Sequence, residues 1–182
     1  MINERVYSQK INKLRSPDRV KLIEVERVVK LSQENIKPAN ILDVGTGSGL
    51  FAEAFEKMGL KVAGIDISEE MIRAVKNFVE RGEFLTAPVE KIPYPDKSFD
   101  LVFLGHVLHE AEDQLKALEE ASRVAKQRVA ILEWPYIKEK SGPPLEHRIS
   151  SEKVSDLAQK IGLKNIEILK LEHMVLIRID IL

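Results

Sequence analysis

Residues 43–49 read DVGTGSG, and this stretch decides the fold. It follows a short apolar run at 41–42 and precedes a segment with helical periodicity, so it predicts a strand, a glycine-rich turn and a helix in that order. Glycine at alternate positions lets the main chain turn sharply, and the backbone N–H groups that open the helix then face a polar ligand. The stretch therefore predicts a ligand site at the end of a buried strand.

Two acidic residues narrow the class of ligand. Asp43 precedes the glycines, where a carboxylate would repel a pyrophosphate but tolerate a cationic amine or sulfonium. The dinucleotide fingerprint G-x-G-x-x-G would need glycine at position 50, which is Leu50. Residues 61–66 read KVAGID and predict a second strand ending in Asp66, where a carboxylate holds a ribose diol. The pattern therefore favours a nucleoside ligand that carries a positively charged group, and it disfavours NAD.

Four further motifs follow in order. Residues 93–102 read PYPDKSFDLV and residues 106–110 read HVLHE, while 118–124 read LEEASRV and 129–133 read VAILE. Together with the glycine-rich turn, they resemble the class I S-adenosylmethionine (SAM) methyltransferases over residues 38–134. The family's runs are LPFPDxSFDLV, xVLHH and L-x-E-x-x-R-V, followed by a fifth strand. Beyond 134, the run GPPLEHR is similar to small-molecule methyltransferases of the ubiquinone/menaquinone C-methyltransferase group.

The resemblance implies SAM as the cofactor and assigns residues to it. The family's adenine-binding acid is replaced by Pro88, so the adenine is expected to be held by the backbone N–H of Val89 and by apolar flanks. The turn and Asp43 are expected at the methionine end, Asp66 at the ribose, and the tip of the fourth strand beside the sulfonium. The cofactor residues expected are Asp43, Gly45, Thr46, Gly47, Gly49, Asp66, Ile67, Met71, Val89, Leu104 and Gly105. The chain has no cysteine, and no metal site is expected.

His106 is the candidate general base, because a histidine accepts a proton at neutral pH and this one follows the fourth strand. The alternative is that it only lines the pocket, since an unprotonated acceptor needs no base. His109 is expected to pack or cap. Three residues are candidates for the acceptor side: Trp134, His147 and Tyr7. The alternative for Trp134 is ordinary packing. The alternative for His147 is a surface position, and for Tyr7 it is a frayed terminus.

Alternating strand and helix patterns predict a single α/β domain over residues 1–182. The expected architecture is a Rossmann-like, doubly wound, mostly parallel sheet of about seven strands, with helices on both faces and one antiparallel strand near the C-terminus. One helix is expected to begin at Ser16 and to continue past residue 28. The expected parts are an N-terminal helical arm (1–37), a cofactor-binding core (38–134), a loop over the acceptor site (135–149), and a C-terminal helix and hairpin (150–182).

Composition restricts the partners. The net charge is −1, the pI is near 6.5, and no apolar run approaches the roughly twenty residues of a membrane span. These features predict a cytoplasmic protein, monomeric or homodimeric, that binds neither nucleic acid nor membrane. Transfer of a methyl group to a small molecule is the first hypothesis, because few residues outside the core remain to build an acceptor site. An RNA or protein methyltransferase and a non-catalytic SAM-binding module are the alternatives.

Overall fold

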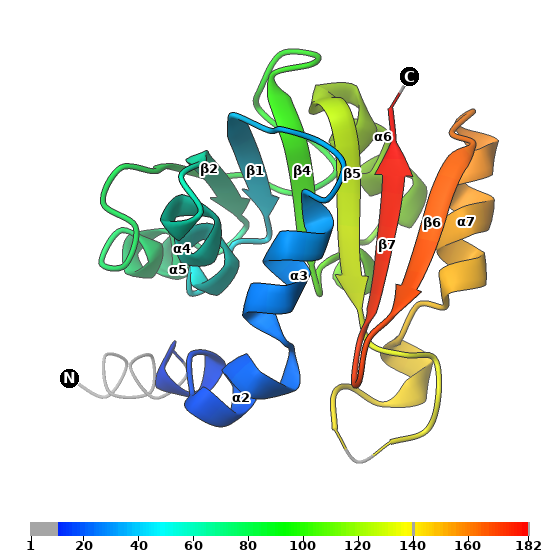
Figure 1. The fold of residues 1–182 in the computed structure, drawn as a ribbon, viewed down its shortest axis with the longest axis horizontal. Helices are drawn as coiled ribbons and strands as arrows, with labels where there is room; N and C mark the ends of the chain where they lie inside the picture. Colours follow the sequence, from blue (N-terminus) through cyan, green and yellow to red (C-terminus); the bar gives the residue numbers. More distant parts are fainter. Residues whose placement is uncertain (1–10, 140, 182) are drawn as a thin grey trace.

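The computed structural model describes residues 11–139 and 141–181, and its centre is a seven-stranded sheet in the order β3-β2-β1-β4-β5-β7-β6 (Figure 1). Neighbouring strands from β3 to β5 run parallel, whereas β7 is antiparallel to both of its neighbours. This confirms the expected sheet with one antiparallel strand. The strands are β1 (Asn40–Val44), β2 (Lys61–Asp66), β3 (Glu83–Thr86), β4 (Phe99–Gly105), β5 (Ala125–Glu133), β6 (Asn165–Lys170) and β7 (Val175–Asp180).

Helices cover both faces of the sheet, because successive side chains along β4 point to opposite faces and both sets are apolar. Leu101 and Phe103 pack in a core with α3, α4 and α5, while Val102 and Leu104 pack on the opposite face against α6 and α7. The helices are α2 (Pro17–Leu22), α3 (Val25–Ser32), α4 (Leu50–Lys57), α5 (Glu69–Val75), α6 (Gln114–Val124) and α7 (Ser151–Lys160), with 3₁₀ turns η1 (Leu108–Glu110) and η2 (Leu145–His147).

The first helix predicted from the sequence is in fact two helices. Ser16 caps α2 as expected, accepting from the backbone N–H of Arg19 at 3.3 Å. The chain then breaks at Glu24, which adopts the left-handed conformation (φ 49, ψ 44) before α3 begins. The Glu24 carboxylate accepts from the backbone N–H of Glu172 at 2.9 Å, so a contact 148 residues away stabilises the break. The expectation of one continuous helix was wrong because that contact is tertiary.

Two buried arginines anchor α3 to the sheet. Arg128 of β5 donates to the carbonyl oxygens of Ser32 and Glu34, and Arg178 of β7 donates to the carbonyl oxygen of Leu31. These carbonyls lie at the C-terminal end of α3 or, for Glu34, just beyond its C-cap, where intrahelical donors are lacking and cations are favoured. The anchored α3 in turn positions α2, which lies beyond the carboxyl ends of the strands (Figure 1).

The fifth strand extends beyond its sequence motif. α6 ends at Val124 and β5 begins at Ala125, four residues before the VAILE motif at 129–133, so the helix passes into the strand without a loop. Because this chain lacks glycines at that point, nothing favours a wider turn.

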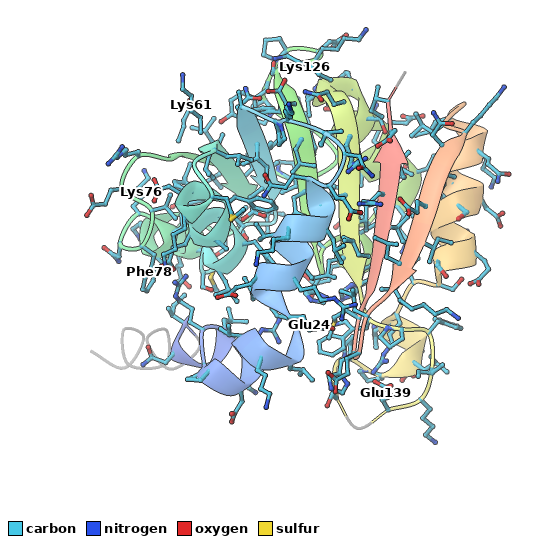
Figure 2. All side chains as sticks on the ribbon, in the orientation of Figure 1. Glu24, Lys61, Lys76, Phe78, Lys126 and Glu139 are labelled. Atoms are coloured by element: carbon cyan, nitrogen blue, oxygen red, sulfur yellow. The ribbon has the colours of Figure 1, made fainter. Side chains whose placement is uncertain are left out.

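The carboxyl ends of the central strands meet at one edge of the sheet. Val44 pairs with Ile65 of β2 and with Leu104 of β4, and the direction of strand order reverses between β1 and β4. In open α/β sheets, ligands bind at this point. Lys61 and Lys126 project from the opposite edge (Figure 2). Across the described ranges 11–139 and 141–181, the helices are too short or too polar to cross a membrane.

Candidate active site

The glycine-rich turn joins β1 to α4. Gly45 and Gly47 have φ values of 68° and 53°, in the left-handed region that favours glycine. A Cβ atom on Gly45 would lie 2.6 Å from Cγ2 of Val107, so this position also has no room for a side chain. The backbone N–H of Thr46 donates to the carbonyl oxygen of Ile65 at 2.9 Å, which fastens the turn to β2.

Asp43 is buried beneath this turn. Its side chain accepts a hydrogen bond from the hydroxyl of Thr46 at 2.7 Å, and the residue is 2% exposed. Burial raises the pKa of Asp43 to about 7, a shift that the Thr46 hydrogen bond opposes and the nearby charge of Asp66 reinforces. A carboxyl in this environment gains most from a ligand that brings a positive charge.

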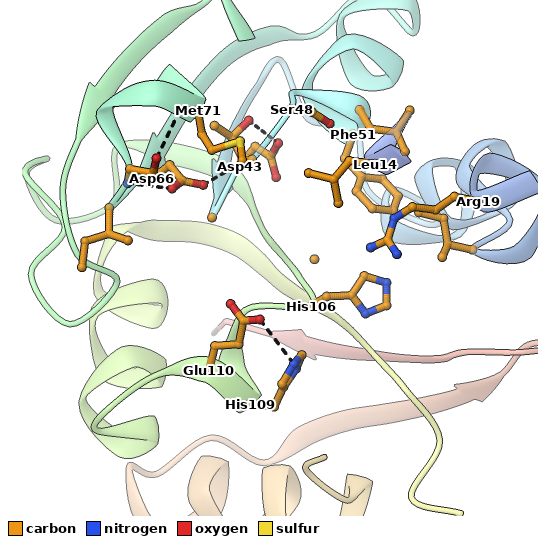
Figure 3. Close-up of a pocket in the computed structure, with 18 of the residues that line it drawn as sticks. Leu14, Arg19, Asp43, Ser48, Phe51, Asp66, Met71, His106, His109 and Glu110 are labelled. Carbon is orange, nitrogen blue, oxygen red and sulfur yellow. Dashed lines mark hydrogen bonds and ion pairs between the residues drawn. The ribbon is translucent and has the colours of Figure 1, made fainter. Parts of the chain in front are cut away.

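Asp66 ends β2 and faces the turn. Its Oδ2 accepts from the backbone N–H of Gly47 at 2.8 Å, and its Oδ1 accepts from the backbone N–H of Ser68 at 2.9 Å (Figure 3). An ionised carboxylate has about four acceptor positions, so about two remain for the hydroxyls of a ligand. Asp66 therefore supports the turn and retains capacity for a diol.

A cavity of about 520 Å³ lies over these groups, and a second of about 340 Å³ shares five residues with it: Gly45, Asp66, Ile67, His106 and Glu110. Residues of the N-terminal arm and of the 135–149 loop line the first cavity together with the turn. From the expected set, the first cavity is lined by Asp43, Gly45, Thr46, Gly47, Asp66, Ile67, Met71, Gly105, His106 and Trp134, and the second adds Val89.

Four expected site residues lie elsewhere. The side chain of Leu104 is fully buried in the core, and Gly49 is the N-cap of α4, with neither among the cavity-lining residues. His147 is exposed in η2 and lines neither cavity. Tyr7 falls outside the described residues. The roles assigned to these residues remain predictions.

His106 follows β4 with a φ of 60°, and its ring lies 5.2 Å from the ring of Trp134 at an interplanar angle of 33°. Its two ring nitrogens are buried and have no hydrogen-bond partner among the described residues. Burial lowers the pKa of His106 to about 3, and the charges of Arg19 and His109 act in the same direction. The imidazole is thus neutral at physiological pH. Its role as a base remains a prediction, and its environment favours that of a pocket wall.

Sequence reasoning missed two groups that line the cavity, Arg19 and His109, and a third, Arg148, that holds the 135–149 loop. Arg19 of α2 points toward His106, and its pKa is lowered by burial (Figure 3). His109, expected only to pack or cap, lines the cavity, and its Nδ1 lies 2.6 Å from Oε2 of the buried Glu133. Arg148 donates to four carbonyl oxygens of the 135–149 loop, those of Pro135, Ile137, Ser141 and Pro143. The sequence held one signal for the pairing of His109 with Glu133. His109 follows the fourth strand and Glu133 ends the fifth, and the carboxyl ends of these neighbouring strands meet.

The sheet order, the turn at the β1 carboxyl end and the acid that ends β2 define a class I SAM-dependent methyltransferase. A family profile described as a methyltransferase domain matches residues 42–132, and the chain belongs to this family. The crystal structure of a SAM-dependent methyltransferase from Aquifex aeolicus is similar over 96% of this chain and 98% of that one, with 31% identity and a TM-score of 0.83.

Two curated bacterial proteins are also similar to this chain. The uncharacterized methyltransferase YcgJ of Bacillus subtilis is 35% identical over 92 residues, and a demethylmenaquinone methyltransferase of Thermotoga maritima is 31% identical over 112 residues. The matched regions cover 48% and 59% of this chain, but the chain spans only 36% and 48% of those relatives.

The residues of the site fit SAM. The buried Asp43 carboxyl, with its raised pKa, suits a cationic ligand, and Gly45 leaves its backbone open to close approach. Asp66 keeps acceptor positions for a ribose diol. The half-buried Val89 lines the second cavity, where an adenine would lie.

Proposed function

We propose that this enzyme transfers the methyl group of SAM to a small-molecule acceptor by in-line displacement. One observation carries the proposal: Leu14 and Arg19 from the arm, and Gly142 and Pro143 from the loop, line the same cavity as the cofactor turn. An acceptor must therefore reach the methyl group inside a chamber of about 520 Å³ that the cofactor partly fills. This space suits a small molecule better than a folded macromolecule.

The loop over residues 135–149 is proposed to cover the acceptor. Arg148 holds its carbonyl groups together, and a Cβ atom on Gly142 would lie 2.6 Å from the Trp134 ring, so the loop packs tightly on that wall. The names of relatives, which include demethylmenaquinone methyltransferases, also support a small acceptor. The near-zero net charge offers no broad electrostatic attraction for RNA.

SAM, when bound, supplies a methyl group already activated by its sulfonium. The protein's task is then to orient the reactants and to exclude water. Asp43 and the turn would hold the methionine end, while Asp66 would hold the ribose. Trp134 and the uncharged imidazole of His106 would form a wall beside the acceptor, and the covering loop would exclude water.

Mass spectrometry of reaction mixtures tests this proposal. The enzyme is incubated with SAM in three separate reactions. One contains a small-molecule extract, one contains total RNA, and one contains a protein fraction. We expect a product gaining one methyl only in the small-molecule extract, and a much smaller amount with Asp66→Ala. Methylation confined to RNA or protein would favour the macromolecular alternative. Calorimetric binding of SAM without methyl transfer to any fraction would favour a non-catalytic module, and binding of NAD without SAM would contradict the cofactor.

A further inference from the structure

His109 and Glu133 form a buried pair at the wall of the cavity. His109 lies in η1, just after β4, and Glu133 is the last residue of β5. Nδ1 of His109 lies 2.6 Å from Oε2 of Glu133, and the backbone N–H of His109 donates to Oε1 of the same carboxylate at 3.2 Å. The two side chains are 7% and 3% exposed. Two contacts to one carboxylate therefore fix the position of the histidine.

The pairing determines which ring nitrogen can react. A carboxylate only accepts hydrogen bonds, so Nδ1 carries the proton and donates it to Glu133. In the neutral ring, the lone pair is then on Nε2. Nε2 lies on the side of Glu110, 3.8 Å from its Oε1, and both residues line the cavity (Figure 3). The same arrangement, a histidine oriented by a buried acid, makes a proton acceptor of histidine in hydrolases.

The charges around His109 come from several elements. Burial by itself lowers the pKa of His109, but the hydrogen bond and charge of Glu133 and the charge of Glu110 outweigh it, so the pKa is raised. Arg148 opposes this rise from the covering loop, and His106 faces the pair from the end of β4. The two histidines of one cavity thus differ, with His106 a far weaker base than His109.

We infer that His109 is the catalytic base, with Glu133 as its positioning residue, and that the acceptor therefore carries an ionisable O–H or an acidic C–H. This inference rests on the proposed methyl transfer to a small molecule. The acceptor oxygen or carbon forms a bond to the methyl carbon as the bond from that carbon to sulfur breaks. The acceptor's proton passes to Nε2 of His109, so the positive charge lost from sulfur appears on the imidazolium, which water then deprotonates. A thioether or tertiary amine, which has no proton to lose, would not need this pair.

The first test measures the histidine and needs no acceptor. Nuclear magnetic resonance titration of the ring nitrogens is carried out on the wild type, Glu133→Gln and the control His173→Asn, which alters an exposed histidine beside Glu172. We expect a His109 pKa above the ordinary value of about 6.5, with Nδ1 protonated in the neutral form. Glu133→Gln should lower that pKa and the control should leave it unchanged. A wild-type pKa at or below 6.5, or a neutral ring protonated on Nε2, would overturn the inference.

The second test separates catalysis from structure with chemical probes. The probes are phenol, whose pKa is about 10 as for tyrosine, 4-nitrophenol, which is far more acidic, a cyclic 1,3-diketone and a dialkyl thioether. The assay pH lies between the pKa values of the two phenols. His109→Asn should lower methyl transfer to phenol by about 100-fold or more, but transfer to 4-nitrophenol by less than about threefold, because an ionised phenol needs no base. His173→Asn should change neither rate.

The pH dependence gives the readout for Glu133. The wild-type rate with phenol should rise with pH up to the measured His109 pKa, because only the neutral imidazole accepts a proton. Glu133→Gln should move this limb to lower pH, and Glu133→Asp should restore part of the wild-type position. Equal losses for both phenols in His109→Asn would show a merely structural role and overturn the inference. Transfer to the thioether but to none of the protic probes would also overturn it, while leaving the proposed methyltransferase function in place.

Discussion

Replacing Asp66 with alanine should weaken SAM binding strongly and should also lower the stability of the fold, by a smaller amount. The carboxylate now accepts from the backbone N–H groups of Gly47 and Ser68, and its remaining acceptor positions face the cavity. Hydrogen bonds to a charged group contribute about 1.5–3 kcal/mol, which corresponds to about 10–150-fold in affinity. The loss of the two backbone contacts should also lower stability, by about 1–2 kcal/mol because the site is only half-buried.

Isothermal titration calorimetry with SAM measures the affinity, and thermal unfolding of the unliganded protein measures the stability. A protein of this size should lose about 2–4 °C in melting temperature per kcal/mol. Asp100→Ala is the matched control, since Asp100 accepts from the backbone N–H of Ala39 at 2.8 Å, at the opposite edge of the sheet. It should lower the melting temperature and leave SAM affinity unchanged.

The reasoning is refuted if Asp66→Ala binds SAM within about twofold of the wild type, a change well under 1 kcal/mol. An equal loss of affinity in Asp100→Ala would show that general destabilisation, and not the lost carboxylate, weakens binding.

Three further predictions concern the same site. Gly45→Ala places a Cβ atom 2.6 Å from Val107 at a φ of 68°, so it should lower the free energy of unfolding by more than the roughly 1–2 kcal/mol of left-handed strain alone. Gly59→Ala is the control, because it has a φ of 91° and no atom within 4 Å, and it should show only the strain. Melting temperatures of the two variants measure the difference. Because the folded pKa of Asp43 is about 7, above the unfolded value near 3.9, the folded state keeps a proton that the unfolded state has lost. The free energy of unfolding should therefore fall as pH rises from about 4 to about 7, and urea titrations of Asp43→Asn should lack this dependence. His106→Ala should lower turnover and SAM affinity together and modestly. The pH–rate profile should stay unchanged, because a group with a pKa of about 3 does not titrate near neutrality. Loss of a limb of that profile near pH 6.5 would instead make His106 the base.

Local sequence signals predicted most of the core. The strand, turn and helix around residues 43–49 and the acid ending β2 follow from glycine spacing and apolar runs, which act over a few residues. The hairpin of β6 and β7 was predictable because the two strands are separated by only a short turn, which requires antiparallel pairing. Ser68 capped α5 as its type and position indicate.

Contacts between distant segments were not predictable from local pattern. The break at Glu24 depends on a hydrogen bond to Glu172, and the covering loop depends on Arg148, whose guanidinium reaches carbonyl groups up to 13 residues away. His109 looked like a packing residue because it follows Leu108 in an apolar stretch. Its partner Glu133 lies 24 residues further on and meets it only because β4 and β5 pair in parallel.

The sequence by itself determined the order of elements, the ligand-binding turn and the class of cofactor, because these depend on residue types at short spacing. The tertiary structure decided the protonation chemistry. Asp43, His106 and His109 have ordinary side chains whose pKa values are moved by burial and by neighbours from other strands and helices. Desolvation depends on everything that packs around a group, so two histidines three residues apart acquire pKa values shifted in opposite directions only once the chain has folded.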